Sequence, residues 1–166
     1  ALISQKLAEE IGLNSEICRE IYVAGLLHDV GKLRTPDHVL NHEGELDEHG
    51  RTIIKRHAVD TQLTLDGLFP NSQIGKWAAN HHERLDGSGY PFKLNASEID
   101  LPSRIIALAD VFQALTQKRP YKGHLELSEV ISIMEPPVVE GKFDGEVFNT
   151  LMSKKNKYYE LARGGT

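Results

Sequence analysis

Apolar residues recur at helical spacing along almost the whole chain, and glycine or proline separates one helical run from the next. In the first run, Ile3, Leu7 and Ile11 fall near one face. Gly12 follows, and glycine is the residue that most often ends a helix. No stretch shows the alternation of apolar and polar residues that a half-buried strand requires. The sequence therefore predicts an all-α fold, a bundle of about six to eight helices without a significant sheet.

Capping residues and prolines set the expected boundaries of these helices. Ser15 is expected to cap the second helix and Ser72 a later, short one. Pro136-Pro137 is expected to separate the last two helices, and Glu10 to lie on an exposed face of the first. The expected helical ranges are 1–11, 15–31, 47–57, a piece ending at 69, 72–82, 102–119, 128–135 and 144–161.

The composition excludes several classes of protein. The 19 Lys plus Arg against 24 Asp plus Glu give a net charge of −5, which argues against a broad surface for duplex nucleic acid. No run approaches the roughly 18 apolar residues of a membrane helix. The single cysteine, Cys18, excludes a disulfide framework and agrees with a reducing cytoplasm, and we expect it in the core. A chain of 166 residues suits one domain.

Two carboxylates interrupt apolar helical runs. Asp29 closely follows the apolar stretch 24–27, and Asp110 stands between the stretches 105–109 and 111–112. A buried carboxylate without a partner is costly, so a cation or strong hydrogen-bond donors are expected beside each of them. A helix cap or a buried salt bridge would explain one such residue equally well. Both together, with histidines nearby, favour a metal.

Histidines complete the candidate ligand set. His81 and His82 are adjacent, and neighbouring residues on a helix point about 100° apart, so both reach one site only if it lies past the helix end or contains two centres. Imidazoles and carboxylates suit first-row divalent metals, and the lack of thiolates favours a catalytic centre over a structural zinc. The expected metal ligands are His28, Asp29, His57, His81, His82 and Asp110. Surface positions are expected for His38, His42, His49 and His124.

Three blocks of the sequence resemble the HD-GYP branch of the HD metal-dependent phosphohydrolase superfamily. Residues 28–32, HDVGK, resemble the H-D-x-G-K signature, and residues 81–91, HHERLDGSGYP, resemble the HHE-x-x-DG-x-GYP segment. Residues 109–112, ADVF, with the later RPY at 119–121, resemble the third block. The H-D dipeptide alone would be weak evidence, but three blocks in order are specific. The resemblance implies an HD-GYP domain over residues 1–166.

This resemblance implies a function. Members of the branch are bacterial phosphodiesterases that hydrolyse cyclic di-GMP to linear pGpG and in some cases on to GMP. By position, the six residues above resemble the family's ligands, with Asp29 bridging two divalent ions and a hydroxide between the ions as nucleophile. Lys32 resembles the catalytic residue that contacts the substrate phosphate or a metal-bound oxygen. Iron, manganese, zinc and nickel fit such ligands equally well.

The resemblance also implies contacts with substrate and partners. The GYP loop shapes the site in the family and has been linked to signalling domains, such as those of the GGDEF type. Its residues here are Gly87, Gly89, Tyr90 and Pro91. Arg119 is the preferred substrate contact among the basic residues, and Tyr121 either stacks on a base or packs in the core.

Two departures from the family pattern keep an alternative open. Members usually carry another histidine in the first helix, and this chain begins just after that place, as expected of a domain excised from a larger multidomain protein without the start of that helix. Gln113 stands where an acid is common. The alternative is a catalytically weak or inactive module that binds cyclic di-GMP or a partner protein. A nucleotidase with one metal is disfavoured by the His81-His82 pair.

Overall fold

The computed structural model describes residues 1–117 and 125–164, and within these ranges every regular element is a helix. The all-α prediction is confirmed. Within the described residues, extended backbone pairs at one isolated β-bridge, between Asp86 and Asn95. The helices are α1 (Leu2–Ile11), α2 (Ser15–Leu27), η1 (Val30–Arg34), α3 (Asp37–Leu40), α4 (Glu48–Lys55), α5 (His57–Leu68), α6 (Ile74–Ala79), η2 (Asn80–His82), α7 (Leu101–Thr116), α8 (Leu127–Val139), α9 (Gly145–Ser153) and α10 (Lys155–Ala162), where η marks a 3-10 helix.

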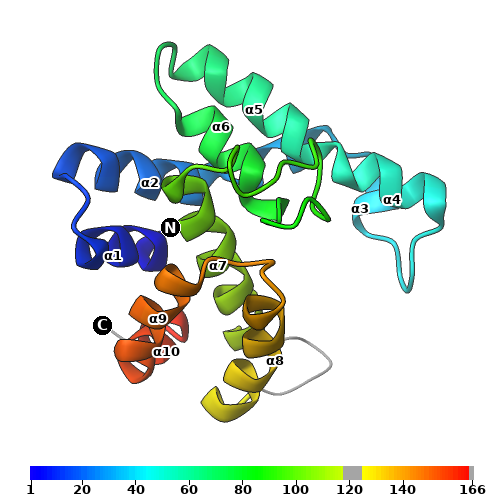
Figure 1. Cartoon of the computed structure of the whole chain (residues 1–166). Helices are drawn as coiled ribbons and strands as arrows, with labels where there is room; N and C mark the ends of the chain where they lie inside the picture. Colours follow the sequence, from blue (N-terminus) through cyan, green and yellow to red (C-terminus); the bar gives the residue numbers. More distant parts are fainter. Residues whose placement is uncertain (118–124, 165–166) are drawn as a thin grey trace.

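Helix α7 forms the centre of the molecule. Asp100 caps it by accepting a hydrogen bond from the Ser103 backbone, and Ile105, Leu108 and Phe112 are fully buried. Figure 1 shows α7 with α2, α5 and α6 above it and with α8, α9 and α10 below. Helix α1 packs against both α2 and α7. The middle of α7, where Asp110 stands, therefore lies between two groups of helices.

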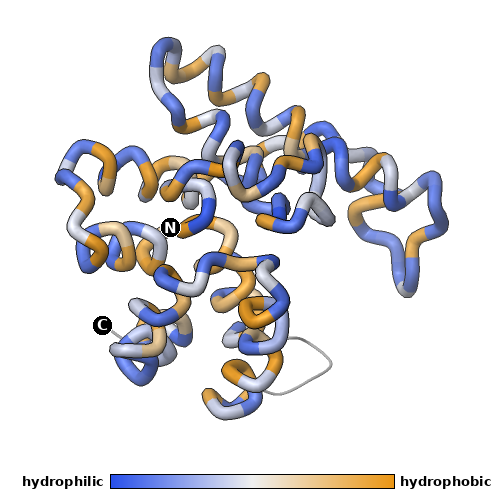
Figure 2. Tube along the Cα trace, in the orientation of Figure 1, coloured by the Kyte–Doolittle hydropathy of each residue, from blue (hydrophilic) through white to orange (hydrophobic). Residues whose placement is uncertain are grey.

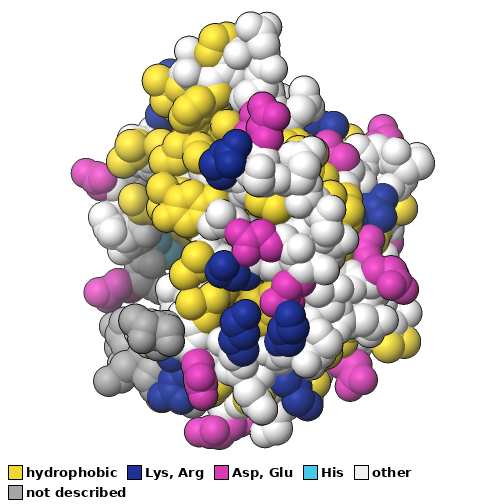
Figure 3. Space-filling model, turned by 90° about the vertical axis from the view of Figure 1, so that its left-hand side faces the viewer, with side chains coloured by type: hydrophobic (Ala, Val, Ile, Leu, Met, Phe, Trp, Pro, Cys, Tyr) yellow, Lys and Arg dark blue, Asp and Glu magenta, His cyan; other side chains and the backbone are white. Residues whose placement is uncertain are grey.

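The surface and the core divide as the sequence pattern predicts. Figure 2 shows hydrophilic residues along most of the loop between α3 and α4, while Cys18 is buried in the core as expected. On the face drawn in Figure 3, Lys and Arg lie among Asp and Glu, and hydrophobic side chains gather in the upper half. Across the described ranges, no helix combines the length and the apolar character needed to span a bilayer.

The second helix begins and ends differently from the prediction. Asn14, not Ser15, is its cap, because the Asn14 side chain accepts a hydrogen bond from the Ile17 backbone. The helix ends at Leu27 instead of continuing to Gly31. The chain then tightens into η1, which holds residues 30–34 against α5.

The prediction that Pro136-Pro137 separates two helices is wrong. Both prolines lie inside α8, in its last turns. Proline has the backbone angle φ of a helix and keeps its carbonyl, although it lacks the N–H donor. The carbonyls of Pro136 and Pro137 accept hydrogen bonds from Glu140 and Lys142, so the helix continues through the pair and ends normally.

The C-terminal segment forms two helices instead of one, and this division contributes to a larger number of helices than expected. The break lies at Lys154, between α9 and α10. Glu10 is also placed differently, because α10 packs against α1 and covers it. The Glu10 carboxylate accepts a hydrogen bond from the Tyr158 hydroxyl and pairs with Lys154 and Lys157. Burial would raise the pKa of Glu10, but its hydrogen bonds from Lys154 and Tyr158 lower it.

Candidate metal centre

Four separate segments bring the six predicted ligands together. His28 and Asp29 follow α2, His57 begins α5, His81 and His82 lie in η2, and Asp110 stands in the middle of α7. Two overlapping groups of side chains have ligand atoms within 4.8 Å of one another in the described part of the chain. One group is His57, His81 and His82, and the other is His28, His81 and Asp110. Both groups consist of residues that the sequence predicts as ligands.

The Asp29 carboxylate lies between these two groups. Its Oδ1 is 3.4 Å from Nε2 of His57 and 3.8 Å from Nε2 of His81. Its Oδ2 is 3.4 Å from Nε2 of His28, which in turn is 3.4 Å from Oδ1 of Asp110. Each oxygen of Asp29 thus faces a different group of histidines.

A shared backbone contact orients three of the histidines. Each Nδ1 lies within hydrogen-bond distance of the carbonyl three residues earlier, at 2.9 Å for His28 and 2.6 Å for His57 and His81. A carbonyl oxygen only accepts, so Nδ1 carries the hydrogen in each ring. The carbonyls belong to Gly25, Ile54 and Ala78. In His57 and His81 the lone pair of Nε2 consequently points towards the cluster, in the tautomer that a metal ligand requires, whereas Nε2 of His28 is hydrogen-bonded to the Asp110 carboxylate.

Electrostatics keep three of the rings neutral. Burial lowers the pKa of His57, that of His81 to about 4 and that of His82 to about 2, and neighbouring imidazoles contribute in each case. Neutral imidazole is the form that binds metal. Burial opposes protonation of His28, but its hydrogen bond with Asp110 and the other nearby aspartate raise its pKa. Burial would also raise the pKa of Asp110, but the His28 contact holds it at about 2.

The donor set fits a divalent cation. Asp29 Oδ1 is buried and accepts no hydrogen bond from the described residues, which is costly for a carboxylate oxygen unless a cation completes its surroundings. The Lys32 ammonium donates to Asp29 Oδ2 at 2.6 Å and compensates part of its charge. Burial would raise the pKa of Asp29, but the hydrogen bond from Lys32 lowers it.

A buried threonine that the sequence did not indicate fixes the turn carrying Asp29. The Thr61 hydroxyl donates to the His28 carbonyl at 3.1 Å and accepts the Gly31 backbone N–H at 2.9 Å. At Gly31 a Cβ atom would lie 2.1 Å from the His57 carbonyl oxygen, so only glycine permits this approach of η1 to α5. The turn before and after Asp29 is therefore attached to the helix that begins with His57.

Glu83 is a second residue whose role the sequence did not reveal, and it holds the GYP loop. Its buried carboxylate accepts the Phe92 backbone N–H at 2.7 Å and the Leu94 backbone N–H at 3.0 Å. Gly89 is buried against Glu83, and a Cβ there would lie 2.5 Å from the Glu83 Cα. The sequence does not show that this acid is buried, so its place directly after two histidines did not indicate the role.

The GYP loop brings its tyrosine to the histidine cluster. The ring of Tyr90 stacks on His82 with 4.5 Å between centroids, and burial raises the pKa of Tyr90. Lys55, at the end of α4, lies over the Tyr90 ring, with Nζ 5.2 Å from its centroid. Pro91 continues the loop after a cis peptide bond, and Gly87 has a positive φ of 78°. The sequence did not single out Lys55.

Two predicted substrate contacts fall between the two described ranges of the chain. Arg119 and Tyr121 lie outside the described residues, so their roles stay predictions. Arg84 is tied into the fold, because it donates to the Glu83 carbonyl and lies over the Phe143 ring at 4.5 Å.

Of the histidines expected at the surface, three are exposed and the fourth lies outside the described ranges. The exposed ones are His38, His42 and His49.

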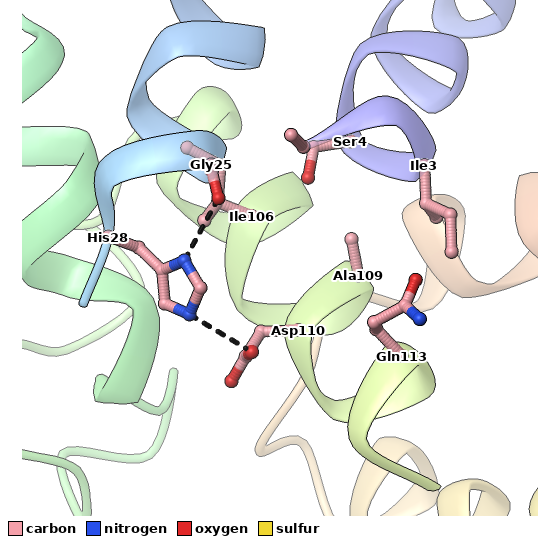
Figure 4. A pocket seen from close by; sticks show the side chains of 9 residues that line it. Ile3, Ser4, Gly25, His28, Ile106, Ala109, Asp110 and Gln113 are labelled. Atoms are coloured by element: carbon pink, nitrogen blue, oxygen red, sulfur yellow. Dashed lines mark hydrogen bonds and ion pairs between the residues drawn. The ribbon is translucent and has the colours of Figure 1, made fainter. Parts of the chain in front are cut away.

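Gln113 lines a small cavity of about 50 Å³ on the α1 side of the centre. Figure 4 shows this cavity between α1, α2 and α7, with His28 bonded to both Gly25 and Asp110. The Gln113 amide donates to the Ala162 carbonyl at 2.9 Å and so connects α7 to the end of α10. At this position the side chain has a structural partner.

Comparison with known proteins agrees with this geometry. A family model described as "HD domain" matches residues 1–147. The chain belongs to the HD domain family. The match and the relatives below also agree with the HD-GYP branch that the motifs indicate.

The relatives that the chain resembles are phosphodiesterases by name. It is 50% identical over 162 residues to the 3′3′-cGAMP-specific phosphodiesterase 1 of Vibrio cholerae, covering 98% of this chain and 38% of that protein. It is 36% identical over 153 residues to a cyclic di-GMP phosphodiesterase of Pseudomonas aeruginosa, with coverages of 92% and 36%. A cyclic di-GMP phosphodiesterase of Thermotoga maritima is 35% identical over 167 residues, with coverages of 93% and 45%. The chain thus spans less than half the length of these relatives.

Proposed function

We propose that this HD domain hydrolyses a phosphodiester bond of a cyclic dinucleotide with two divalent ions. The observation that carries the proposal is the position of Asp29, a carboxylate with one oxygen towards each of two histidine groups. A bridging carboxylate between two ions is the arrangement expected of two-metal phosphodiester hydrolysis. The similarity to proteins named as cyclic dinucleotide phosphodiesterases supports the same chemistry.

The ligands divide between the two ions by distance. Asp29 Oδ1, His57, His81 and His82 would hold one ion, and Asp29 Oδ2, His28 and Asp110 the other. His81 belongs to both groups, and we place it with the first because its Nε2 lies 3.5 Å from Nε2 of His57. Iron, manganese, zinc and nickel all suit nitrogen and oxygen donors.

The residues around the ions would bind and orient the substrate. Bound divalent ions supply a nucleophile active at neutral pH and neutralise charge on the phosphoryl oxygens. The Lys32 ammonium, now 2.6 Å from Asp29, would contact a phosphate oxygen at the same edge of the centre. The GYP loop with Tyr90 would cover the histidine side and keep water from that face. Linear pGpG, or GMP after a second hydrolysis, is the expected product from cyclic di-GMP.

Two substrates need to be distinguished. Cyclic di-GMP follows from the HD-GYP motifs and from relatives in several bacteria. The 50% identity with a protein named as specific for 3′3′-cGAMP favours that molecule as the second candidate. A comparison of kcat/KM for the two, measured on the metal-loaded protein by chromatography of the products, decides between them.

Replacement of Asp29 tests the proposed chemistry. Asp29→Asn keeps the size of the side chain but weakens both metal contacts, so we expect loss of turnover and of bound metal in elemental analysis, with helical circular dichroism retained. Glu43→Gln removes a carboxylate from an exposed loop and serves as the control. Full activity of Asp29→Asn would remove Asp29 from the mechanism. A metal-loaded wild type that binds but does not hydrolyse either nucleotide would support the binding module instead.

A further inference from the structure

A groove of about 450 Å³ opens beside the candidate metal centre, along the end of α2, η1 and α3. Two residues of the centre, Asp29 and Lys32, form part of its lining. Its volume is within the roughly 300–1,000 Å³ that small-molecule sites have. The remaining lining consists of five apolar and two polar residues. These are Leu26, Leu27, Val30, Leu33 and Leu40, with Thr35 and Asp37.

The groove leaves large apolar side chains in contact with water. Leu33 is 87% exposed, Leu26 59% and Leu40 43%. In contrast, Leu27 and Val30 are half-buried and pack against the core, which fixes the floor of the groove. Exposed leucines gathered around a polar centre indicate a binding surface more than a random surface pattern.

We propose that this groove binds a guanine base of the cyclic dinucleotide, an inference that rests on the function proposed above. A phosphate at Lys32 is joined to each of its bases through one ribose, so a base must lie close to the centre. A flat heteroaromatic ring buries its faces against leucine side chains favourably. Because Asp29 and Lys32 line both the centre and the groove, the same molecule can occupy both.

Asp37 gives the groove a means of selecting the base. Its exposed carboxylate, at the start of α3, accepts hydrogen bonds but cannot donate them. Guanine presents two donors, N1–H and N2–H, side by side on one edge, whereas adenine presents an unprotonated N1 beside its amino group. A carboxylate therefore pairs with guanine through two hydrogen bonds and repels the lone pair of adenine N1.

Substitutions at the rim test this assignment. Asp37→Asn replaces an acceptor by a group that both donates and accepts, and Leu33→Ser removes apolar contact. The controls are Glu43→Gln and Leu63→Ser, which change exposed residues outside the groove lining. Binding of cyclic di-GMP and cyclic di-AMP to the metal-free protein in EDTA is measured by isothermal titration. Turnover of the metal-loaded protein is measured with cyclic di-GMP and with bis(p-nitrophenyl) phosphate, a small ester without a base.

We expect both rim variants to weaken binding of cyclic di-GMP, Asp37→Asn by roughly ten- to hundredfold, as for loss of hydrogen bonds to a charged group. Asp37→Asn should also reduce the preference over cyclic di-AMP, and the ratio of kcat/KM for cyclic di-GMP to that for the small ester should fall. Unchanged binding of cyclic di-GMP by either rim variant, or equal losses for both nucleotides in Asp37→Asn, would overturn the assignment. Failure of the wild type to hydrolyse the ester and the nucleotide would refute the proposed function separately, because groove binding is measured without metal.

Discussion

Replacement of Thr61 by valine isolates the contact that attaches the Asp29 turn to α5. Valine has nearly the shape of threonine but lacks the hydroxyl, so the change removes two hydrogen bonds without creating a cavity. The Gly31 N–H and the His28 carbonyl lose the partners that the structure gives them, at 2.9 and 3.1 Å. Thr61 is fully buried, which limits replacement of these bonds by water.

The expected cost follows from these two groups. A buried donor or acceptor left without a partner costs about 1–3 kcal/mol. Two such groups, offset in part by the more apolar valine, give about 2–4 kcal/mol of lost stability. In a domain of this size a loss of about 3 kcal/mol lowers the thermal midpoint by roughly 6–12 °C. Turnover should fall as well, because Asp29 lies between the two released groups.

Urea unfolding followed by circular dichroism measures the change in free energy, with two matched variants beside it. Thr61→Ser keeps the hydroxyl and should cost less than about 1 kcal/mol, from one lost methyl group. Thr64→Val makes the same chemical change one turn later, where the hydroxyl donates to the carbonyl of Asp60 in its own helix, and should stay within about 0.5 kcal/mol. The reasoning is refuted if Thr61→Val is as stable as Thr64→Val.

Three further predictions concern the loop, acid stability and metal. Glu83→Gln retains one acceptor oxygen instead of two. The backbone amides of Phe92 and Leu94 should therefore exchange faster with deuterium, and KM should rise. Unchanged exchange would contradict the role of Glu83 in anchoring the loop. Burial would raise the pKa of Asp100, but the hydrogen bond from Lys76 holds this pKa below the ordinary 3.8. The ionised carboxylate therefore stabilises the fold fully above about pH 4, and this stabilisation is lost as the pH falls through the lower pKa of the folded state. Asp100→Asn should therefore lose less stability than the wild type between pH 7 and pH 3 in urea unfolding, and an equal loss would count against this contact. Manganese at about 100 times its dissociation constant should stabilise the wild type by about 2.7 kcal/mol in thermal unfolding, and the Asp29→Asn variant much less. An equal gain in stability for both proteins would show that the ion binds elsewhere.

The sequence alone predicted the fold class and the six residues of the candidate metal centre. Helical spacing is a local property, so runs such as residues 105–115 predict a helix without knowledge of their neighbours. Asp29 and Asp110 stood out because they interrupt apolar runs and are costly without a partner, and His81 and His82 stood out because they are adjacent. All six expected ligands lie in one cluster in the structure.

Only the tertiary structure decided how these residues act on one another. Thr61 reaches the Asp29 turn from more than thirty positions later in the chain, and Glu83 holds backbone donors nine and eleven residues away. Nothing in the spacing of such residues distinguishes them from ordinary buried or surface side chains. The same holds for the exposed leucines beside Lys32, which form a groove only after η1 packs on α5. Residue type determines which groups a side chain can bind. Packing determines which Asp29 oxygen faces which imidazole, because the distances between these atoms depend on helices that meet only in the folded chain.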